Sequence, residues 1–354
     1  MQTIFDKSKD GKRCASIRPL RVGEWKYKHG RTSLNLPSVC EADLIEHYMG
    51  MIKEGEHYPV SLGQMAMNLD GFINVHPLQD EQTIEGCLEL VYNVQEAIKH
   101  ICGADAVSLV PMPGKEGQFA ALWIADEFFK ASGGGELCGK VIVFEGDKGV
   151  LCDETALCGF EVLKARSNAT GGVDLEHFKE ILGKDIAAVF ISYPNMDGRI
   201  ESEIKEVIRL ARAVGALVVC DGTRLDELTG IVRPMDLGCD IVCLEGGAVG
   251  VKKDLARFLP KGIVERDKKG RYFVQAKGSI GRVSMYFGEF MKMVDYWSHI
   301  LRHGGDGLKE AAQIKTLIKR SQKTQKPQKM QIENIKKEDE NTDERESVGA
   351  IEVQ

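Results

Sequence analysis

Between residues 106 and 245 the sequence alternates short, almost wholly apolar runs with amphipathic stretches. The apolar runs occupy 106–111, 140–145, 160–165, 186–191, 216–221 and 239–245. Helical patterns fill 117–130, 174–182 and 201–214, and Asp174 is the expected N-cap of the second. An earlier helical pattern covers 83–101, with Thr83 as its expected N-cap. Runs that are apolar at nearly every position suit strands that are buried on both faces. The alternation therefore predicts an α/β domain with a mostly parallel sheet and helices on both faces.

Composition excludes several classes of protein. The apolar runs are much shorter than the roughly 20 residues of a membrane-spanning helix. The 47 basic and 53 acidic residues leave a net charge of -6, which argues against a general nucleic-acid or anionic-membrane binder. The first residues, MQTIFDKSKDGKR, lack the apolar core of a secretory signal, so we expect a cytoplasmic protein. The ten cysteines form no C-x-x-C pair, which favours small buried residues and predicts no metal site.

The ends of the chain differ in character from its middle. Residues 1–75 are irregular and charged, with one helical pattern over 38–52, and predict an N-terminal arm. This arm contains Trp25, Tyr27 and Tyr58, which a lone arm cannot bury, so we expect it to contact a partner. Residues 76–319 carry the α/β pattern. Residues 320–354 have no aromatic and few apolar side chains, which predicts a disordered polar tail.

Polar residues at the carboxyl ends of the predicted strands are the first candidates for a functional site. Asp221 ends the run 216–221, although an Asp there can also serve as a helix cap. The loop 113–118 lies between a strand and a helix, where backbone N–H groups can hold a phosphate. Residues 192–195 follow another strand. His76 is either an acid or base, or a structural histidine.

Longer stretches of the chain carry a family resemblance. They include HYPVSLGQMAMN at 57–68, HPLQDEQTIEGCLEL at 76–90, ICGADAVSLVPMPGKEGQ at 101–118, and VCDGTRLDELTGIVRPMDLGCDIV at 219–242. Over roughly residues 1–315 the sequence resembles, in the same order, the P-protein of the glycine cleavage system, glycine dehydrogenase (aminomethyl-transferring), in its subunit 2 form.

This resemblance implies the large domain of a pyridoxal phosphate-dependent transferase of fold type I. In the family a lysine binds the cofactor as a Schiff base, glycine loses carbon dioxide, and the aminomethyl group passes to the lipoyl arm of a carrier protein. Asp221 matches the residue that pairs with the pyridinium nitrogen. Gly114, Gly117 and Gln118 match the phosphate-binding loop. The resemblance also implies a homodimer, or a heteromer with a subunit 1-like chain.

The sequence departs from the family at the residues that carry the chemistry. The family's His-Lys-Thr motif and the glycine-rich loop after it are deleted, so the strand near 240–244 runs directly into EGGAVG. Lys252 and Lys253 correspond to an ordinary family lysine instead. Lys148 replaces the histidine that stacks on the cofactor, and Lys115 adds a charge to the phosphate loop. The match ends near Lys319, so the small C-terminal domain is expected to be largely missing.

We therefore assign no catalytic residue and expect covalent cofactor binding to be lost. Three functions stay open at this point. The favoured interpretation is a degenerate, non-catalytic scaffold or regulatory subunit. The alternatives are an active decarboxylating subunit that uses another lysine or a partner chain, and a different binding function that uses Asp147, Asp226, Lys148 or Arg224 near the strand ends.

Overall fold

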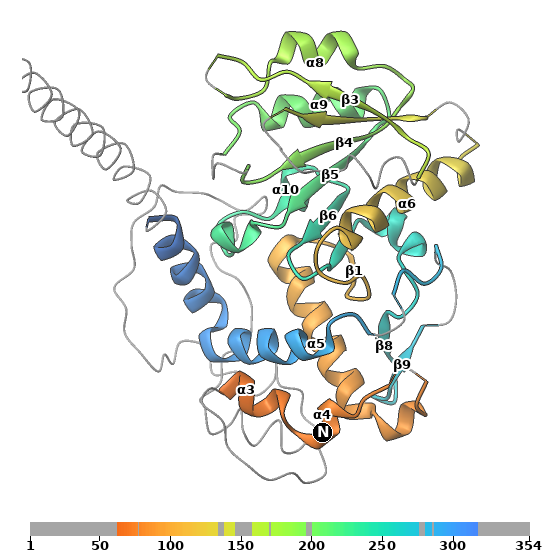
Figure 1. Ribbon diagram of the computed structural model, residues 1–354, viewed down its shortest axis with the longest axis vertical. Coiled ribbons are helices and arrows are strands. Elements are labelled where there is room, and N and C mark those ends of the chain that lie inside the picture. The colour runs from red at the N-terminus through yellow and green to blue at the C-terminus, as the bar shows by residue number, and fades with distance from the viewer. Residues whose placement is uncertain are drawn as a thin grey trace, which may run out of the picture.

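The computed structural model describes residues 62–76, 78–133, 138–145, 158–169, 171–195, 200–275, 280–284 and 287–317. A sheet of seven strands, in the order β1-β7-β6-β5-β4-β2-β3, forms its centre (Figure 1). The strands are β1 (Ala106–Ser108), β2 (Lys140–Phe144), β3 (Glu161–Ala165), β4 (Ile186–Ser192), β5 (Leu217–Gly222), β6 (Ile241–Leu244) and β7 (Val249–Val251).

The strand pairing confirms a mostly parallel sheet. The neighbours from β3 to β6 all pair in parallel, whereas β7 is antiparallel to both β6 and β1. In this register Ser192 of β4 lies opposite Asp221 of β5, and Asp221 lies opposite Cys243 of β6. The carboxyl ends of three central strands therefore meet at one edge of the sheet, where ligands bind in folds of this kind.

Helices cover both faces of the sheet, as predicted. One apolar cluster packs α6 (Glu116–Ala131) and the 3₁₀ helix η3 (Lys253–Phe258) on one face. The other cluster, on the opposite face, includes α5 (Glu85–Cys102), α8 (Leu175–Ile181), α9 (Ile204–Ala213) and α10 (Pro234–Leu237). The short η2 (Leu225–Leu228) follows β5. Asp174 caps α8 as expected, because its side chain accepts hydrogen bonds from the N–H groups of Glu176 and His177.

Segments outside the sheet complete the second apolar cluster. Helices α3 (Leu62–Met67) and α4 (Asp70–Ile73), and the helical residues 290–317, contribute Ala66, Phe72, Trp297 and Leu301, which are all buried. The hairpin of β8 (Val264–Arg266) and β9 (Tyr272–Val274) packs against α5 (Figure 1). The predicted tail 320–354 and the predicted helix over 38–52 lie outside the described residues. No described helix is both long and apolar enough to cross a membrane.

One predicted boundary was wrong in a way that has a clear cause. Thr83, which the pattern favours as the N-cap of the helix over 83–101, ends the 3₁₀ helix η1 (Glu81–Thr83) instead. Its hydroxyl donates to the Asp80 carbonyl at 2.7 Å, so the side chain is not available as a cap. Ile84 takes the N-cap position of α5 and makes no side-chain cap.

Candidate functional site

Asp221 lies at the carboxyl end of β5, where two donors hold its side chain. Its Oδ1 accepts a hydrogen bond from the backbone N–H of Thr223 at 3.1 Å, and its Oδ2 accepts one from the Gln118 side-chain amide at 3.0 Å. Asp221 is only 6% exposed. Burial disfavours a carboxylate that lacks such donors. The structure therefore brings together two of the residues that the sequence predicts for cofactor binding.

Gln118 has one polar atom left over. The residue lies in the first turn of α6 and is buried. Its Nε2 donates to Asp221, while its Oε1 is buried with no hydrogen-bond partner among the described residues. Most buried polar atoms in folded proteins are paired. The Gln118 Oε1 is thus a position at which a donor from a bound molecule or a water would be stabilised.

The loop before α6 contains Gly114, which has a φ of +101° and would have nothing within 4 Å of an added Cβ. It therefore faces open space, as a phosphate-binding loop must. However, the Glu116 carboxylate accepts a hydrogen bond from the backbone N–H of Met112 at 2.7 Å. This loop already holds a negative charge from the chain itself, and a second anion placed there would be repelled.

The turn between β6 and β7 packs directly onto this loop. Residues 245–248 connect the two antiparallel strands, and the Gly247 N–H donates to the Leu244 carbonyl at 3.1 Å. Gly247 has a φ of +87°, and an added Cβ there would meet the carbonyl oxygens of Pro111 and Met112 at 2.2 and 2.5 Å. An added Cβ on Gly117 would meet the Gly247 carbonyl at 3.1 Å. Backbone thus fills the space beside the loop, and the turn contains no lysine.

The next lysines along the chain lie elsewhere. The Lys252 ammonium contacts the Asp240 carboxylate at 2.8 Å and the Gly238 carbonyl at 3.3 Å. Both partners precede β6, so Lys252 is at the opposite end of that strand from the Asp221 edge. Lys253 is exposed, and its backbone N–H donates to Asp105. Neither lysine lies at the Asp221 edge of the sheet, where the family resemblance places the cofactor lysine.

A cavity of about 730 Å³ opens beside the same edge of the sheet. Its lining includes Gly114, Gly222, Thr223 and Glu245 from the loops at the strand ends. The α5 side chains of Val94, Ile98 and Ile101 form an apolar wall, and the opposite wall comes from the helical residues after 288. Asp221 and Gln118 are not among the described residues that line it. The cavity therefore reaches the predicted loop and strand end without reaching the buried carboxylate.

The charged lining of this cavity is mostly acidic. It includes Asp226, Glu245, Glu289 and Asp295, against one ammonium group, that of Lys292. The Lys292 Nζ lies 2.8 Å from the Glu289 carboxylate and is largely exposed. The pKa of His299 is lowered, first because surrounding protein excludes water and then because of the nearby His303, whose ring centroid is 4.4 Å away. The cavity favours neutral or cationic groups over anions.

The other predicted residues are placed as follows. Residues 192–195 lie beside the end of β5, where the Tyr193 N–H donates to the Asp221 carbonyl at 3.1 Å. Asp226 lines the cavity and pairs with Lys315. Arg224 pairs with Glu227 at 2.7 Å. His76 is exposed and accepts from the Leu78 N–H, away from the described cavity lining. Asp147 and Lys148 lie outside the described residues.

Sequence reasoning missed the helical wall of the cavity. Glu289, Lys292, Tyr296 and His299 recur at helical spacing and share one face, all lining the cavity. That periodicity was available in the sequence and is the signal that could have identified them. Glu116 was also missed, because its contact depends on how the side chain folds back onto the loop.

The candidate metal ligands and the cysteines are two further groups of side chains in the described part of the chain. It contains no group of three or more His, Cys, Asp or Glu side chains that could hold a metal ion. Five of the described cysteines are buried, namely Cys87, Cys102, Cys220, Cys239 and Cys243. Burial raises the pKa of the Cys102 thiol to about 12, so it stays protonated and unreactive at neutral pH. These residues match the prediction of small buried side chains.

Pyridoxal phosphate, the cofactor that the family resemblance implies, fits these residues poorly. The buried Asp221 suits a pyridinium nitrogen, and the open Gly114 suits a phosphate loop. Against this, the Glu116 carboxylate sits on the loop, the Gly247 turn fills the space beside it, and neither the turn nor Lys252 offers an amine to the cofactor. The residues present do not fit the cofactor held through a Schiff base at this position.

Comparison with known proteins places the chain in a family. Residues 149–246 match the aminotransferase class-V family model. A probable glycine dehydrogenase (decarboxylating) subunit 2 from Caldanaerobacter subterraneus subsp. tengcongensis is 34% identical over 89% of this chain and 72% of its own length. The protein of the same description from Thermotoga maritima is 32% identical over 89% of this chain and 73% of its own length.

A solved structure agrees with this placement at the level of the fold. The crystal structure of a glycine cleavage system glycine decarboxylase (P-protein), in inhibitor-bound form, superposes with a TM-score of 0.60 at 17% identity, over 77% of this chain and 69% of that one. The sheet order, the fold and the curated relatives agree, and so this chain belongs to the family of glycine dehydrogenase (decarboxylating) subunit 2 proteins, for which pyridoxal phosphate is the implied cofactor.

Proposed function

We propose that this chain is a non-catalytic member of its family that serves as a scaffold or regulatory subunit. The observation that carries this proposal is the short turn from β6 to β7. Residues 245–248 join the strands without a lysine, and Gly247 packs onto the carbonyls of Pro111 and Met112. A Schiff base needs an amine at the cofactor, and the turn supplies none.

Two further contacts support the same proposal. The Met112 N–H, directly before the predicted phosphate loop, already donates to the Glu116 carboxylate. The two oxygens of Asp221 already accept from Gln118 and Thr223, and Asp221 does not line the neighbouring cavity. Each contact is made within the chain, so these polar groups are already satisfied without a cofactor.

The partner in this proposal is a subunit 1-like chain or a second copy of this one. The relatives are named as subunit 2, which supports a role within an assembly. A lipoyl carrier protein is a further proposed partner, and the cytoplasm is the proposed location. Light scattering after size-exclusion chromatography tests association. The proposal predicts a dimer of this chain alone, or a complex when a subunit 1-type chain is added. A stable monomer in both samples would contradict it.

The claim that this chain is non-catalytic is tested by measuring the release of carbon dioxide from carboxyl-labelled glycine. The full chain is mixed with a subunit 1-type chain, a lipoyl carrier protein and pyridoxal phosphate. The proposal predicts release no greater than that of the same mixture without this chain. A complete subunit 2 relative serves as the positive control. Release that rises in proportion to this chain would contradict the proposal.

One observation favours the alternative of an active decarboxylating subunit. Lys292 lines the cavity that also contacts Gly114 and Gly222, so an amine is present near the predicted loop. Its ammonium is already paired with the Glu289 carboxylate at 2.8 Å and is largely exposed, which opposes a role as a nucleophile. An active subunit would hold pyridoxal phosphate on a lysine, and borohydride would trap it as a pyridoxyl-lysine, whereas a non-catalytic chain would give no such product. Loss of that product in the variant Lys292→Met would assign it to this lysine.

A further inference from the structure

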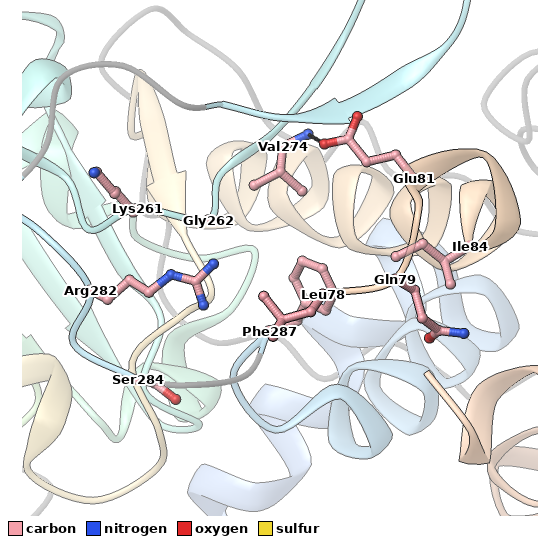
Figure 2. A pocket seen from close by; sticks show the side chains of 10 residues that line it. All are labelled: Leu78, Gln79, Glu81, Ile84, Lys261, Gly262, Val274, Arg282, Ser284 and Phe287. Atoms are coloured by element: carbon pink, nitrogen blue, oxygen red, sulfur yellow. Dashed lines mark hydrogen bonds between the residues drawn. The ribbon is translucent and has the colours of Figure 1, made fainter. Parts of the chain in front are cut away.

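The cavity beside the Asp221 edge of the sheet is large enough for a small organic molecule. Its volume of about 730 Å³ lies within the roughly 300–1,000 Å³ of small-molecule sites. A second cavity, of about 240 Å³, lies below this range, between the start of α5 and the β8–β9 hairpin. Figure 2 shows that the Glu81 carboxylate of this smaller cavity is directed at the Val274 backbone N–H, from which it accepts a hydrogen bond at 3.0 Å. The larger cavity is therefore the stronger candidate for a ligand.

One wall of the large cavity is apolar. Helix α5 contributes Val94, Ile98 and Ile101, which are all buried. Met293, from the helical residues after 288, adds an apolar side chain from the opposite wall. A surface of this kind favours a ligand with an apolar body, because their contact removes both apolar surfaces from water.

Both walls are held in place by contacts within the chain. The Gln95 side-chain amide donates to the Val264 carbonyl and accepts from the Val264 N–H, each at 3.0 Å, which fixes α5 against β8. On the opposite wall Gly288 has a φ of +69°, and an added Cβ would collide with the carbonyl oxygen of Leu109, a lining residue. Glycine therefore permits this close approach. Fixed walls reduce the entropy cost of binding.

Two carboxylates of the lining form no ion pair within the described part of the chain. Glu245 follows β6, Asp295 lies on the helical residues 290–317, and both are exposed. Asp295 lies beside Gly63 of α3, where an added Cβ would come within 3.1 Å of the Asp295 Cγ. The other two carboxylates of the lining are paired with ammonium groups, Asp226 with that of Lys315 and Glu289 with that of Lys292. The lining therefore keeps a negative charge, which attracts cations.

The surrounding protein shields the polar side chains of the lining from bulk water. Tyr296 is 38% exposed, yet exclusion of water raises the pKa of its hydroxyl to about 12. His299 is also exposed, and exclusion of water lowers its pKa, so it is uncharged at pH 7 and does not oppose a cation. The exposed surface of both side chains thus faces the cavity. In such surroundings a carboxylate attracts a cation more strongly than in water, and the Tyr296 ring adds to this attraction.

We propose that this cavity binds a small organic cation, namely a primary ammonium group on an apolar body. Glu245 and Asp295 attract the ammonium group, while Ile98, Ile101 and Met293 cover the apolar part. Such a ligand is opposite in charge to pyridoxal phosphate, so the cavity selects against the cofactor that the family implies. The inference deepens the regulatory part of the proposed function, and it rests on that proposal because a chain that held the cofactor would use this edge of the sheet for it.

The test is calorimetric titration of the full chain, without pyridoxal phosphate, with four probes. These are 4-phenylbutylamine, the uncharged 4-phenylbutan-1-ol, the anionic 4-phenylbutanoate, and methylammonium, which lacks the apolar body. We expect saturable binding of the amine and binding of the alcohol that is at least about tenfold weaker, because the charged hydrogen bonds are lost. Methylammonium should bind at least about tenfold more weakly than the amine as well. The carboxylate should bind more weakly than the alcohol, because the lining repels it.

Variants locate the binding. Glu245→Gln should weaken the amine at least about fivefold and reduce its dependence on salt, while the affinity for the alcohol stays unchanged. Asp295→Asn should act in the same direction. Glu180→Gln, at an exposed carboxylate on α8 outside the cavity lining, is the matched control and should keep the wild-type affinity. Glu81→Gln removes the carboxylate of the smaller cavity and should also leave the affinity for the amine unchanged.

Several results would overturn the proposal. They are equal binding of the amine and the alcohol, binding of the carboxylate as tight as that of the amine, and no saturable binding of the amine up to about 5 mM. Wild-type affinity in both Glu245→Gln and Asp295→Asn, or a loss of affinity in Glu81→Gln alone, would also contradict it. Circular dichroism establishes that each variant is folded, and if one of the two cavity variants fails to fold, the other decides the question.

The outcome is separable from that of the proposed function. The titrations contain no pyridoxal phosphate, whereas the proposed function is tested by the release of carbon dioxide from glycine in its presence. Failure of the amine to bind, with no carbon dioxide release, would overturn this inference alone. Carbon dioxide release that depends on this chain would overturn the proposed function whatever the titrations show.

Discussion

The Gln118 side-chain amide donates to the Asp221 carboxylate at 3.0 Å, which joins the first turn of α6 to the end of β5. Helix α6 follows the predicted phosphate loop, and its Gln118 supplies this donor. The family resemblance instead pairs the Asp221 carboxylate with the pyridinium nitrogen of the cofactor. Both residues are buried. A contact within the chain therefore stabilises a charge that would otherwise need a ligand to offset its burial.

This contact predicts a measurable contribution to stability. Gln118→Met keeps the side-chain volume but removes the donor to a buried carboxylate, so the free energy of unfolding should fall by about 1–3 kcal/mol. Urea denaturation measures the change. Gln82→Met, on an exposed side chain, is the control and should shift stability by no more than about 0.5 kcal/mol. Equal effects of the two substitutions would contradict the contact.

Lys252 is predicted to act structurally. Its ammonium and Arg212 both contact Asp240, whose side chain is 12% exposed and also accepts from the Val218 N–H. Lys252→Met should destabilise the fold by about 1–2 kcal/mol because a mostly buried carboxylate loses a charged partner. Lys253→Met, at the exposed neighbouring position, should change stability by less than about 0.5 kcal/mol. A larger effect at Lys253 would reverse the assignment.

The framework of the sheet could be predicted because it depends on local pattern. Continuous apolar runs gave β2, β4 and β5 within a residue or two, and Asp174 was correctly expected to cap α8. The position of Asp221 at a strand end followed from the same pattern. The absence of the family's lysine motif stays a prediction from the resemblance, in which the run ending at Leu244 leads directly into Glu245 and two glycines.

The features that were not predicted depend on long-range contacts. Strand β7 is three residues with a central glycine, and only its pairing with both β1 and β6 makes it a strand. The packing of Gly247 on Pro111 joins segments more than 130 residues apart, which no local pattern reports. The fold-back of Glu116 onto Met112 is a side-chain conformation, and the sequence contains no signal for it.

Stability should depend on pH through His299 and the neighbouring His303. Exclusion of water lowers the pKa of both His299 and His303 below the usual 6.5, and Arg302 lowers both while Asp295 partly opposes the shift at His299. The unfolded chain then binds more protons than the folded one as the pH falls through about 6.5, so the free energy of unfolding decreases with falling pH.

Urea denaturation between about pH 8 and 5.5 measures this dependence. The variant His299→Gln should flatten it, because one of the two groups with a lowered pKa is removed. His177→Gln, on α8 and outside the cavity lining, serves as the control and should keep the wild-type slope. An unchanged slope in His299→Gln would assign the pH dependence to other groups.

The buried cysteines should be inert toward alkylation. Burial raises the pKa of the Cys102 thiol to about 12, and it raises the pKa of Cys243 as well. At pH 8, iodoacetamide should modify the partly exposed Cys138 in the native protein and leave Cys102 and Cys243 unmodified until urea unfolds the chain. Peptide mass spectrometry identifies the sites. Native-state labelling of Cys243 at the rate of Cys138 would show that the strand edge opens.

The central claim is that no lysine of this chain holds pyridoxal phosphate, and borohydride trapping tests it most directly. The full chain is incubated with excess pyridoxal phosphate, reduced, digested and mapped, with a complete subunit 2 relative as the positive control. We predict no visible absorption band of a lysine-bound cofactor and no stoichiometric pyridoxyl-lysine peptide. Stoichiometric labelling of a single lysine, lost in the corresponding variant such as Lys292→Met, would contradict the account.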